Sequence, residues 1–279
     1  MESVSVLVLT LNESDNLPRC LQAVGWADDI LVLDSFSTDD TVEVAKRHGA
    51  RVIQRKFDGF AGQRNFGLEH GQLKHEWVLH LDADEVVSDA LRDEIVQVIE
   101  TTDKQAFYLA SKMMLHDKWL KYSGMYPAYQ VRLGRRDRLK FVQVGHGQRE
   151  TLSPDQLGTL REPLIHYSFS KGMADWFERH NRYSTDEAAK TKNAEEGGTI
   201  RWADLFSLRD RVRRRRALKE LSSYLPCRPL LRFLYMYVLR LGFLDGREGF
   251  TYCRLLAIYE SMIVLKQKEL RRRKQGKSI

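Results

Sequence analysis

Apolar strands alternate with amphipathic helices over about the first 90 residues of the chain. Residues 4–9 are apolar at almost every position, as expected for a parallel strand that is covered on both faces, and a polar segment and a helical pattern follow them. The same order recurs in residues 29–48, and further strands are predicted at 51–54 and 77–81. This alternation predicts an α/β domain with a Rossmann-like, mostly parallel sheet flanked by helices.

The pattern becomes mixed beyond residue 105. Short strands are predicted at 106–109, 130–133 and 140–144, and residues 179–191 have a helical pattern. We therefore expect the α/β domain to occupy residues 1–200.

Polar side chains follow the first, second and fourth predicted strands, at the point where each strand ends. These residues are Thr10, Asn12, Glu13, Asp34, Asp82 and Asp84. Because open α/β sheets bind ligands outside the carboxyl ends of their strands, we expect these side chains to line one crevice. The chain contains neither a G-x-G-x-x-G sequence nor a Walker sequence, which argues against a dinucleotide oxidoreductase or an ATPase.

Three carboxylates, those of Asp82, Asp84 and Glu85, directly follow the fourth strand. Carboxylates packed so tightly repel one another, and a divalent cation is a reason to place them at a strand end. Hard oxygen ligands suit Mg²⁺ or Mn²⁺, which bridge to substrate phosphates. The alternative is an exposed acidic turn that caps a helix beginning near Ser88, and the Asp-x-Asp pattern alone does not decide between the two.

Charge is distributed unevenly along the chain. Residues 201–279 contain 20 Lys and Arg against 7 Asp and Glu, so the total of 45 against 38 leaves 25 against 31 in residues 1–200. The net charges of the two parts are therefore +13 and −6. This asymmetry indicates an anionic partner for the carboxyl-terminal part, either a membrane leaflet or a nucleic acid.

Two apolar runs, residues 230–244 and 255–265, lie between basic clusters. As helices they would be about 22 Å long or less, short of the ~30 Å hydrocarbon core of a bilayer. We expect a basic helix or linker at 201–225, followed at 226–279 by an amphipathic helical hairpin in the interface of an anionic membrane. The alternative is a two-helix lid that is buried on the main domain.

The three cysteines, Cys20, Cys227 and Cys253, are widely spaced and form no metal-ligand pattern. They are typical of free thiols in a reducing compartment. The amino terminus has no basic segment and enters a strand at once, so we expect no signal peptide. These features predict a cytoplasmic protein that is peripheral on the inner face of the cytoplasmic membrane.

Four short segments occur in order over the first 85 residues: VLVLTLNE at 6–13, VLDSFSTDDT at 32–41, GQRNFG at 62–67 and LDADE at 81–85. Together they resemble the successive signatures of family-2 glycosyltransferases with the GT-A fold. The similarity is greatest to bacterial enzymes that add sugars to lipopolysaccharide core or other envelope glycans, and it extends to about residue 246. It implies an inverting, metal-dependent hexosyltransferase that uses a nucleotide-diphosphate sugar, with a UDP-sugar favoured, and a lipopolysaccharide or lipid-linked acceptor.

The resemblance also implies roles for the polar residues. Three positions at the end of the first strand, together with Asp34, would hold the base and ribose of the nucleotide; the three are Thr10, Asn12 and Glu13. Arg64 would lie near the diphosphate, Asp82 would contact the donor, and Asp84 would ligate Mg²⁺ or Mn²⁺ to stabilise the charge that develops on the leaving group. His166 is similar to the carboxyl-terminal histidine that completes the metal or diphosphate site in many GT-A enzymes.

An inverting transfer needs a general base for the acceptor hydroxyl. Related enzymes carry Val-His-Glu beyond the metal motif, whereas this chain has VGHGQRET at 144–151, in which the His and the Glu are separated. We predict Glu150 as the base, with His146 as the alternative. Four nearby aromatic residues would suit sugar rings, although core packing explains them equally well; they are Trp119, Tyr122, Tyr126 and Tyr129.

Two other functions are compatible with parts of the sequence. A nucleotidyltransferase also uses an acidic metal site on a Rossmann-like sheet, but it would need a glycine-rich basic loop after the first strand, where this chain has Thr10-Leu11-Asn12-Glu13. A nucleic-acid-binding module could be built on the basic carboxyl-terminal part. The apolar runs between the basic clusters favour a membrane instead, and we expect no nucleic-acid partner.

Overall fold

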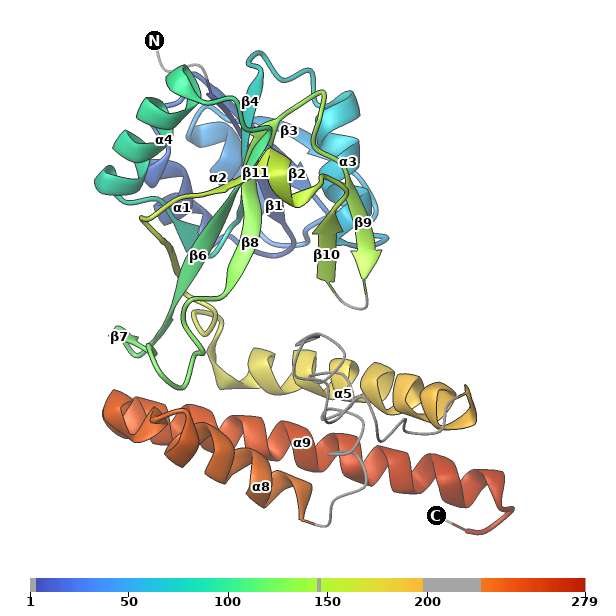
Figure 1. Cartoon of the computed structure of the whole chain (residues 1–279). Coiled ribbons are helices and arrows are strands. Elements are labelled where there is room, and N and C mark those ends of the chain that lie inside the picture. The colour runs from blue at the N-terminus through green and yellow to red at the C-terminus, as the bar shows by residue number, and fades with distance from the viewer. Residues whose placement is uncertain (1–3, 145–146, 198–226, 279) are drawn as a thin grey trace. The chain divides into compact units, whose positions relative to one another are not determined.

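The computed structural model of the chain describes residues 4–144, 147–197 and 227–278 (Figure 1). The chain divides into two compact units. The first comprises Met1–Lys121 and Met125–Ser170, and the second comprises Tyr122–Gly124 and Lys171–Ile279.

The first unit is built on a mixed sheet of ten strands with the order β3-β2-β1-β4-β8-β6-β12-β5, to which β7 and β11 are added by pairing with β6. Its strands are β1 (Val4–Thr10), β2 (Asp29–Asp34), β3 (Arg51–Gln54), β4 (Trp77–Asp82), β5 (Glu85–Val86), β6 (Ala106–Leu115), β7 (Lys118–Trp119), β8 (Tyr129–Arg135), β11 (Leu157–Thr159) and β12 (Leu164–His166). Strands β3, β2, β1 and β4 are parallel, and β8 runs antiparallel to both β4 and β6. A separate antiparallel ribbon consists of β9 (Phe141–Val144) and β10 (Gly147–Glu150). The expected α/β class is confirmed.

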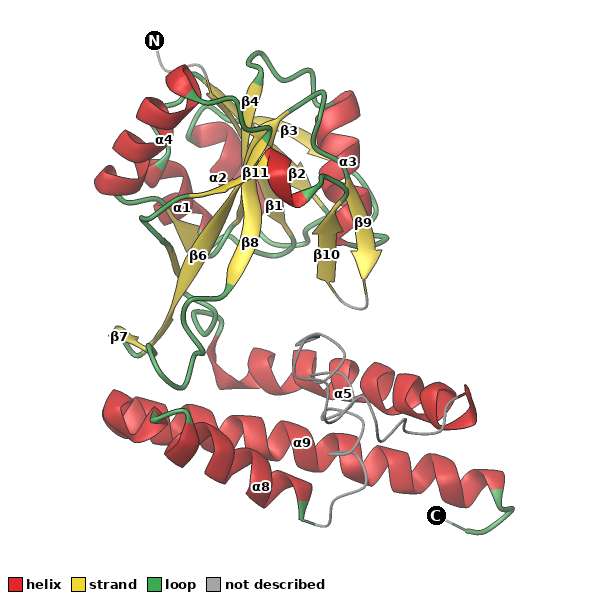
Figure 2. Ribbon diagram, in the orientation of Figure 1, coloured by secondary structure: helices red, strands yellow, loops and turns green. Residues whose placement is uncertain are grey.

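Helices cover both faces of this sheet (Figure 2). They are α1 (Leu17–Ala23), α2 (Thr41–Arg47), α3 (Phe60–His70) and α4 (Asp89–Thr101), with a short 3₁₀ turn, η1 (Pro154–Gln156), before β11. All seven residues of β1 are buried. Because side chains alternate along a strand, Val6 and Val8 join a core with α1, α2 and α4, while Leu7 and Leu9 join a second core with α3 and β9. Burial on both faces explains why five of the seven residues of this strand are apolar.

Helix α3 lies unusually close to β1. A Cβ atom at Gly67 would come within 2.4 Å of the Leu7 side chain, so only glycine allows this approach. The close packing fixes α3, and with it Arg64 one turn earlier, against the end of the sheet.

The second unit is helical. It contains α5 (Gly172–Gly197), α8 (Arg228–Leu234), the π-helical turn η2 (Tyr235–Leu239), the 3₁₀ turn η3 (Gly242–Asp245) and α9 (Gly246–Lys274). Helix α9 packs against both α5 and α8. The ammonium group of Lys266 on α9 donates to the Asn181 carbonyl at 2.5 Å and to the Ser184 hydroxyl at 2.8 Å, which ties α9 to α5.

The carboxyl-terminal helical hairpin expected from the sequence is present, but its second arm differs from the expectation. The apolar run at 255–265 lies within the 29-residue helix α9, and its Leu255, Leu256 and Ile263 are buried inside the unit. Among the described residues, every helix is too short or too polar to traverse a bilayer. The linker expected at 201–225, and the boundary expected at residue 200, lie outside the described residues.

Candidate active site at the strand ends

Asp34 is fully buried at the end of β2 and organises the first two strand ends. Its carboxylate accepts hydrogen bonds from the Thr10 hydroxyl at 2.9 Å, the Ser37 amide at 2.9 Å and the Gln54 side-chain amide at 3.0 Å, and also from the Ser37 hydroxyl. Thr10 and Asp34 are register partners in the sheet, so the sequence correctly placed them together. Both side chains are buried and hydrogen-bonded to other protein groups, and these bonds hold the loops that follow the strands in place.

Those loops are tied to each other by polar contacts. Asn12 has a left-handed backbone with φ 54°. The backbone amide of Asn12 donates to the Ser37 hydroxyl at 2.8 Å, and its side-chain oxygen accepts from the backbone amide of Thr38 at 2.7 Å. Glu13 accepts a hydrogen bond from the Asn16 side chain at 2.8 Å. These contacts join the loops after β1 and β2 into one polar rim, and the shared crevice expected from the strand ends stays a prediction.

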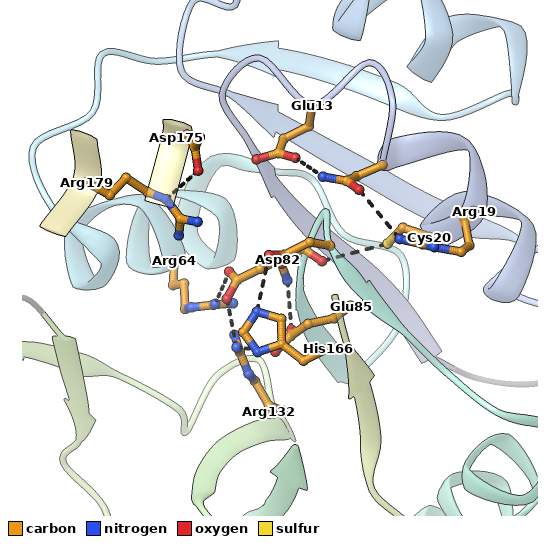
Figure 3. A network of polar contacts seen from close by, with 12 residues as sticks. Glu13, Arg19, Cys20, Arg64, Asp82, Glu85, Arg132, His166, Asp175 and Arg179 are labelled. Carbon is orange, nitrogen blue, oxygen red and sulfur yellow. Dashed lines mark hydrogen bonds and ion pairs between the residues drawn. The ribbon is translucent and has the colours of Figure 1, made fainter. Parts of the chain in front are cut away.

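The acidic segment that begins at Asp82, the last residue of β4, is held by two buried arginines (Figure 3). Asp82 accepts from Arg64 at 2.7 Å through one oxygen and from Arg132 at 2.7 Å through the other. Arg132 also donates to Glu85 at 2.6 Å, and Glu85 accepts from the Asp82 amide at 2.9 Å. The exposed fractions are 1% for Arg64, 3% for Arg132 and 0% for Glu85. Guanidinium groups therefore balance the repulsion between Asp82 and Glu85.

Electrostatics keep Asp82 and the two arginines charged, whereas burial raises the pKa of Glu85. Burial alone would raise the pKa of the Asp82 carboxyl, but the guanidinium groups of Arg132 and Arg64 outweigh it and hold that pKa well below its usual range. Burial and the neighbouring Arg132 lower the pKa of Arg64 to about 10, so Arg64 stays a cation at neutral pH. His80 lies on β4, fully buried, and burial together with both arginines holds its pKa far below the usual range.

Arg132 was not predicted from the sequence, and part of its hydrogen-bonding capacity is unused. Within the described part of the chain, Nη1 of Arg64 and both Nε and Nη1 of Arg132 are buried without a hydrogen-bond partner. A buried N–H group that lacks an acceptor is costly, so the two guanidinium groups are suited to a further anion. The available signal was an arginine inside a run of buried strand residues, Val131 to Gly134.

Asp84 and His166 form a second polar pair. The His166 Nε2 atom lies 3.2 Å from an Asp84 carboxylate oxygen, and the Tyr167 amide donates to the Asp84 carbonyl at 2.9 Å. The pairing of β12 with β5 brings them together across 82 residues of sequence. Burial would lower the pKa of His166, but the Asp84 carboxylate outweighs it and raises that pKa to about 9.

This pair fits a divalent cation in part. A carboxylate and an imidazole can both ligate a divalent metal, and Mg²⁺ and Mn²⁺ usually keep several positions for substrate phosphates and water. Among the described residues, no three His, Cys, Asp or Glu side chains are arranged to hold a metal. Asp84 and His166 would therefore provide two ligands and depend on a bound ligand for the others, while the oxygens of Asp82 are already engaged by arginines.

The ribbon of β9 and β10 adds one residue to the centre. Gln148 accepts a hydrogen bond from Arg64 Nε at 3.1 Å. Glu150 lies two positions further on the same face of the strand, about 7 Å along it, and accepts from the Tyr108 hydroxyl at 2.6 Å. This contact raises the pKa of Tyr108 to about 12. His146 lies outside the described residues.

The predicted aromatic group is only partly gathered. The rings of Trp119 and Tyr126 meet edge to face with centroids 5.0 Å apart, and the Lys112 ammonium lies 4.9 Å from the Trp119 ring centroid. Tyr129 is exposed, and Tyr122 belongs to the second unit.

A family model described as "Glycosyl transferase family 2" matches residues 5–147. An uncharacterized glycosyltransferase of Rickettsia prowazekii is 40% identical over 116 residues, which cover 41% of this chain and 39% of that protein. The match therefore spans about two fifths of the relative's length. The lipopolysaccharide core biosynthesis glycosyltransferase LpsC of Rhizobium meliloti is 29% identical over 198 residues, which cover 66% of this chain and 70% of that protein.

Two solved structures are also similar. One is glucosyl-3-phosphoglycerate synthase from Mycobacterium tuberculosis in complex with Mn²⁺, UDP-glucose and phosphoglyceric acid, with a TM-score of 0.48, 17% identity, and coverage of 67% of this chain and 78% of that one. The other is S. aureus TarS 1-349 in complex with UDP-GlcNAc, with a TM-score of 0.45, 14% identity, and coverage of 98% and 92%.

Proposed function

The chain belongs to glycosyl transferase family 2, whose model covers just over half of it, and we propose that it transfers a hexose from a nucleotide-diphosphate sugar to a lipopolysaccharide or lipid-linked acceptor. The reaction would take place at the cytoplasmic face of the membrane. The observation that carries the proposal is the buried pair Arg64 and Arg132, with unpaired N–H groups, beside Asp84 and His166. Such a centre suits a diphosphate that gains negative charge as it leaves.

On the donor side, the rim formed by the loops after β1 and β2 would receive the nucleoside. Asn12 is exposed there, whereas the buried Thr10 and Asp34 would act by fixing the loops. Arg64 and Arg132 would bind the diphosphate, and Asp82 would hold both guanidinium groups in place. UDP-sugars are the donors that we favour.

Asp84 and His166 would hold Mg²⁺ or Mn²⁺. When bound, the cation supplies charge stabilisation for the leaving diphosphate. The chain's own contribution is the positive charge of the two arginines, which is already in place and needs no reorganisation during the reaction.

Binding of the donor can be tested first, by thermal unfolding. We expect one class of nucleotide sugar among uridine, guanosine and deoxythymidine diphosphate sugars to raise Tm when Mn²⁺ is present, and less so without it. At a ligand concentration of 100 Kd the stabilisation is about 2.7 kcal/mol, or roughly 5–10 °C for a chain of this size. The matched control is the corresponding nucleoside, which lacks the diphosphate. If no member of the panel shifts Tm in either condition, the proposed function is wrong.

The acceptor side can be tested at Glu150. We propose that its carboxylate takes the proton of the acceptor hydroxyl, with Tyr108 orienting it. Glu150→Gln keeps the shape but removes the base, so kcat should fall by about 10²–10⁴ while the KM for the donor changes little. Tyr108→Phe is the matched control, because it keeps the carboxylate and should cost much less. Near-normal turnover in Glu150→Gln would exclude this base and direct the same test to His146.

A further inference from the structure

One face of the α8–η2 segment and the turn after it expose large apolar side chains. We call these residues the outer apolar face: Leu230, Leu231, Leu234, Tyr235, Val238, Leu239, Leu241, Phe243 and Leu244. The first six recur at positions i, i+1, i+4, i+5, i+8 and i+9, so they form one continuous helical stripe. Every one of the nine is at least 42% exposed, and Leu239 reaches 73%.

The opposite side of the same segment is apolar as well and is already used. Met236 is fully buried against Cys253 of α9, and Phe233 and Tyr237 pack on Phe250 with ring centroids 5.7 and 5.6 Å apart. Among the described residues, packing within the unit therefore accounts for one side only. A helix that is apolar all round is normally covered all round, and a contiguous exposed apolar surface marks an interaction site.

The charges beside this face indicate what covers it. Residues 227–278 contain 12 Lys and Arg against 4 Asp and Glu. Two of the four acidic groups are engaged inside the unit, because Asp245 accepts from Ser123 at 2.6 Å and Glu260 pairs with Arg228 at 2.5 Å. The exposed charge is therefore mainly positive.

Exposed arginines stand next to the apolar residues at one end of the face. Arg240 lies between Leu239 and Leu241, and Arg247 follows the turn. Tyr235 adds an amphipathic ring of the kind that lies at the boundary between headgroups and acyl chains, and Phe243 adds a purely apolar ring. An anionic bilayer surface offers both an apolar layer and negative headgroups to such an arrangement.

We propose that the outer apolar face inserts into the acyl boundary of an anionic bilayer, while Arg240 and Arg247 contact the headgroups. This face is the surface through which the protein would contact the membrane. The proposal rests on the proposed function only for the membrane location. Helix α9 then acts as an internal support, since its own apolar residues Leu255, Leu256 and Ile263 are buried.

The test is flotation of the full-length protein with vesicles of phosphatidylcholine, with and without about one third phosphatidylglycerol. We expect binding to the anionic vesicles and much less to the neutral ones. The double variant Leu239→Glu/Leu244→Glu should lower the partition coefficient by at least about tenfold for each leucine that no longer inserts. Leu265→Glu is the matched control, because Leu265 on α9 is 66% exposed but lies outside the face, and this variant should float like the wild type.

Other outcomes would overturn the proposal. Equal flotation of the double variant and the wild type would exclude the face as the contact. If light scattering shows a wild-type dimer and a monomeric double variant, and the wild type binds no vesicles, the face would be assigned to a second copy of the chain. A monomeric wild type that binds neither kind of vesicle would also contradict it. The Tm shift with nucleotide sugar is measured without lipid and is therefore independent of flotation. If this shift is absent, the proposed transfer is contradicted, while the flotation result stands.

Discussion

Replacing Asp84 with asparagine is expected to abolish sugar transfer while the protein stays folded. The Asp84 carboxylate touches His166, and the two are the proposed metal ligands. Asparagine keeps the shape and keeps the backbone carbonyl that accepts from Tyr167, but it removes the negative charge that would hold the cation. We expect kcat to fall by at least about 10²–10³, and the effect of Mn²⁺ on the Tm measured with nucleotide sugar to disappear.

The controls for Asp84→Asn separate metal binding from general damage. Chelation of the wild type should reproduce the loss of activity, and added Mn²⁺ should restore the wild type but not the variant. Asp89→Asn is the matched control, because that side chain is 91% exposed on α4 and pairs only loosely, with Arg92 at 3.2 Å. Activity of Asp84→Asn that persists in the presence of chelator would refute the assignment of Asp84.

The strand-end residues were predictable because their positions follow from local rules. A buried strand that is followed by a polar residue places that residue at the carboxyl edge of the sheet, and the register confirms the neighbourhood: Thr10 pairs with Asp34, and Leu9 with Asp82. The acidic segment and a helix beginning near Ser88 were both predicted. The acidic turn does not cap that helix, because its N-cap is Ser88, whose hydroxyl accepts from the Leu91 amide at 3.2 Å.

Arg132 and the role of Glu85 could not be predicted, because they depend on a strand order that local patterns do not contain. Strand β8 is antiparallel to β4 and comes about 50 residues later, and only that pairing brings Arg132 to Asp82 and Glu85. The two arms of the carboxyl-terminal hairpin were likewise indistinguishable in the sequence. Both runs are apolar between basic clusters, but long-range packing buries Leu255, Leu256 and Ile263 of the second run and leaves one side of the first run exposed.

Removing the cation of Arg132 should give the largest loss of stability. In Arg132→Met the buried Asp82 and Glu85 face each other with one guanidinium fewer. Breaking a buried ion pair by removing one partner costs about 3–5 kcal/mol, which corresponds to a Tm lower by roughly 6–20 °C. Transfer should fall as well, because the proposed diphosphate site loses the donors of Arg132. Arg132→Lys is the matched control, since it keeps the charge without the forked geometry, and it should lose less stability.

The pH dependence distinguishes this electrostatic cause from a packing defect. In the wild type the pKa of Asp82 is depressed in the folded state, so its contribution to stability is present above its usual pKa near 3.8 and is lost as the pH falls below it. In the wild type burial already raises the pKa of Glu85. In Arg132→Met the pKa of Asp82 should rise and that of Glu85 should rise further, so the variant loses more stability than the wild type as the pH increases. The difference in Tm between the two proteins should therefore be smaller at pH 5 than at pH 8. If the difference in Tm does not depend on pH, Arg132 acts through packing alone. If the Tm of Arg132→Met lies within about 2 °C of that of the wild type, Arg132 does not hold the centre together.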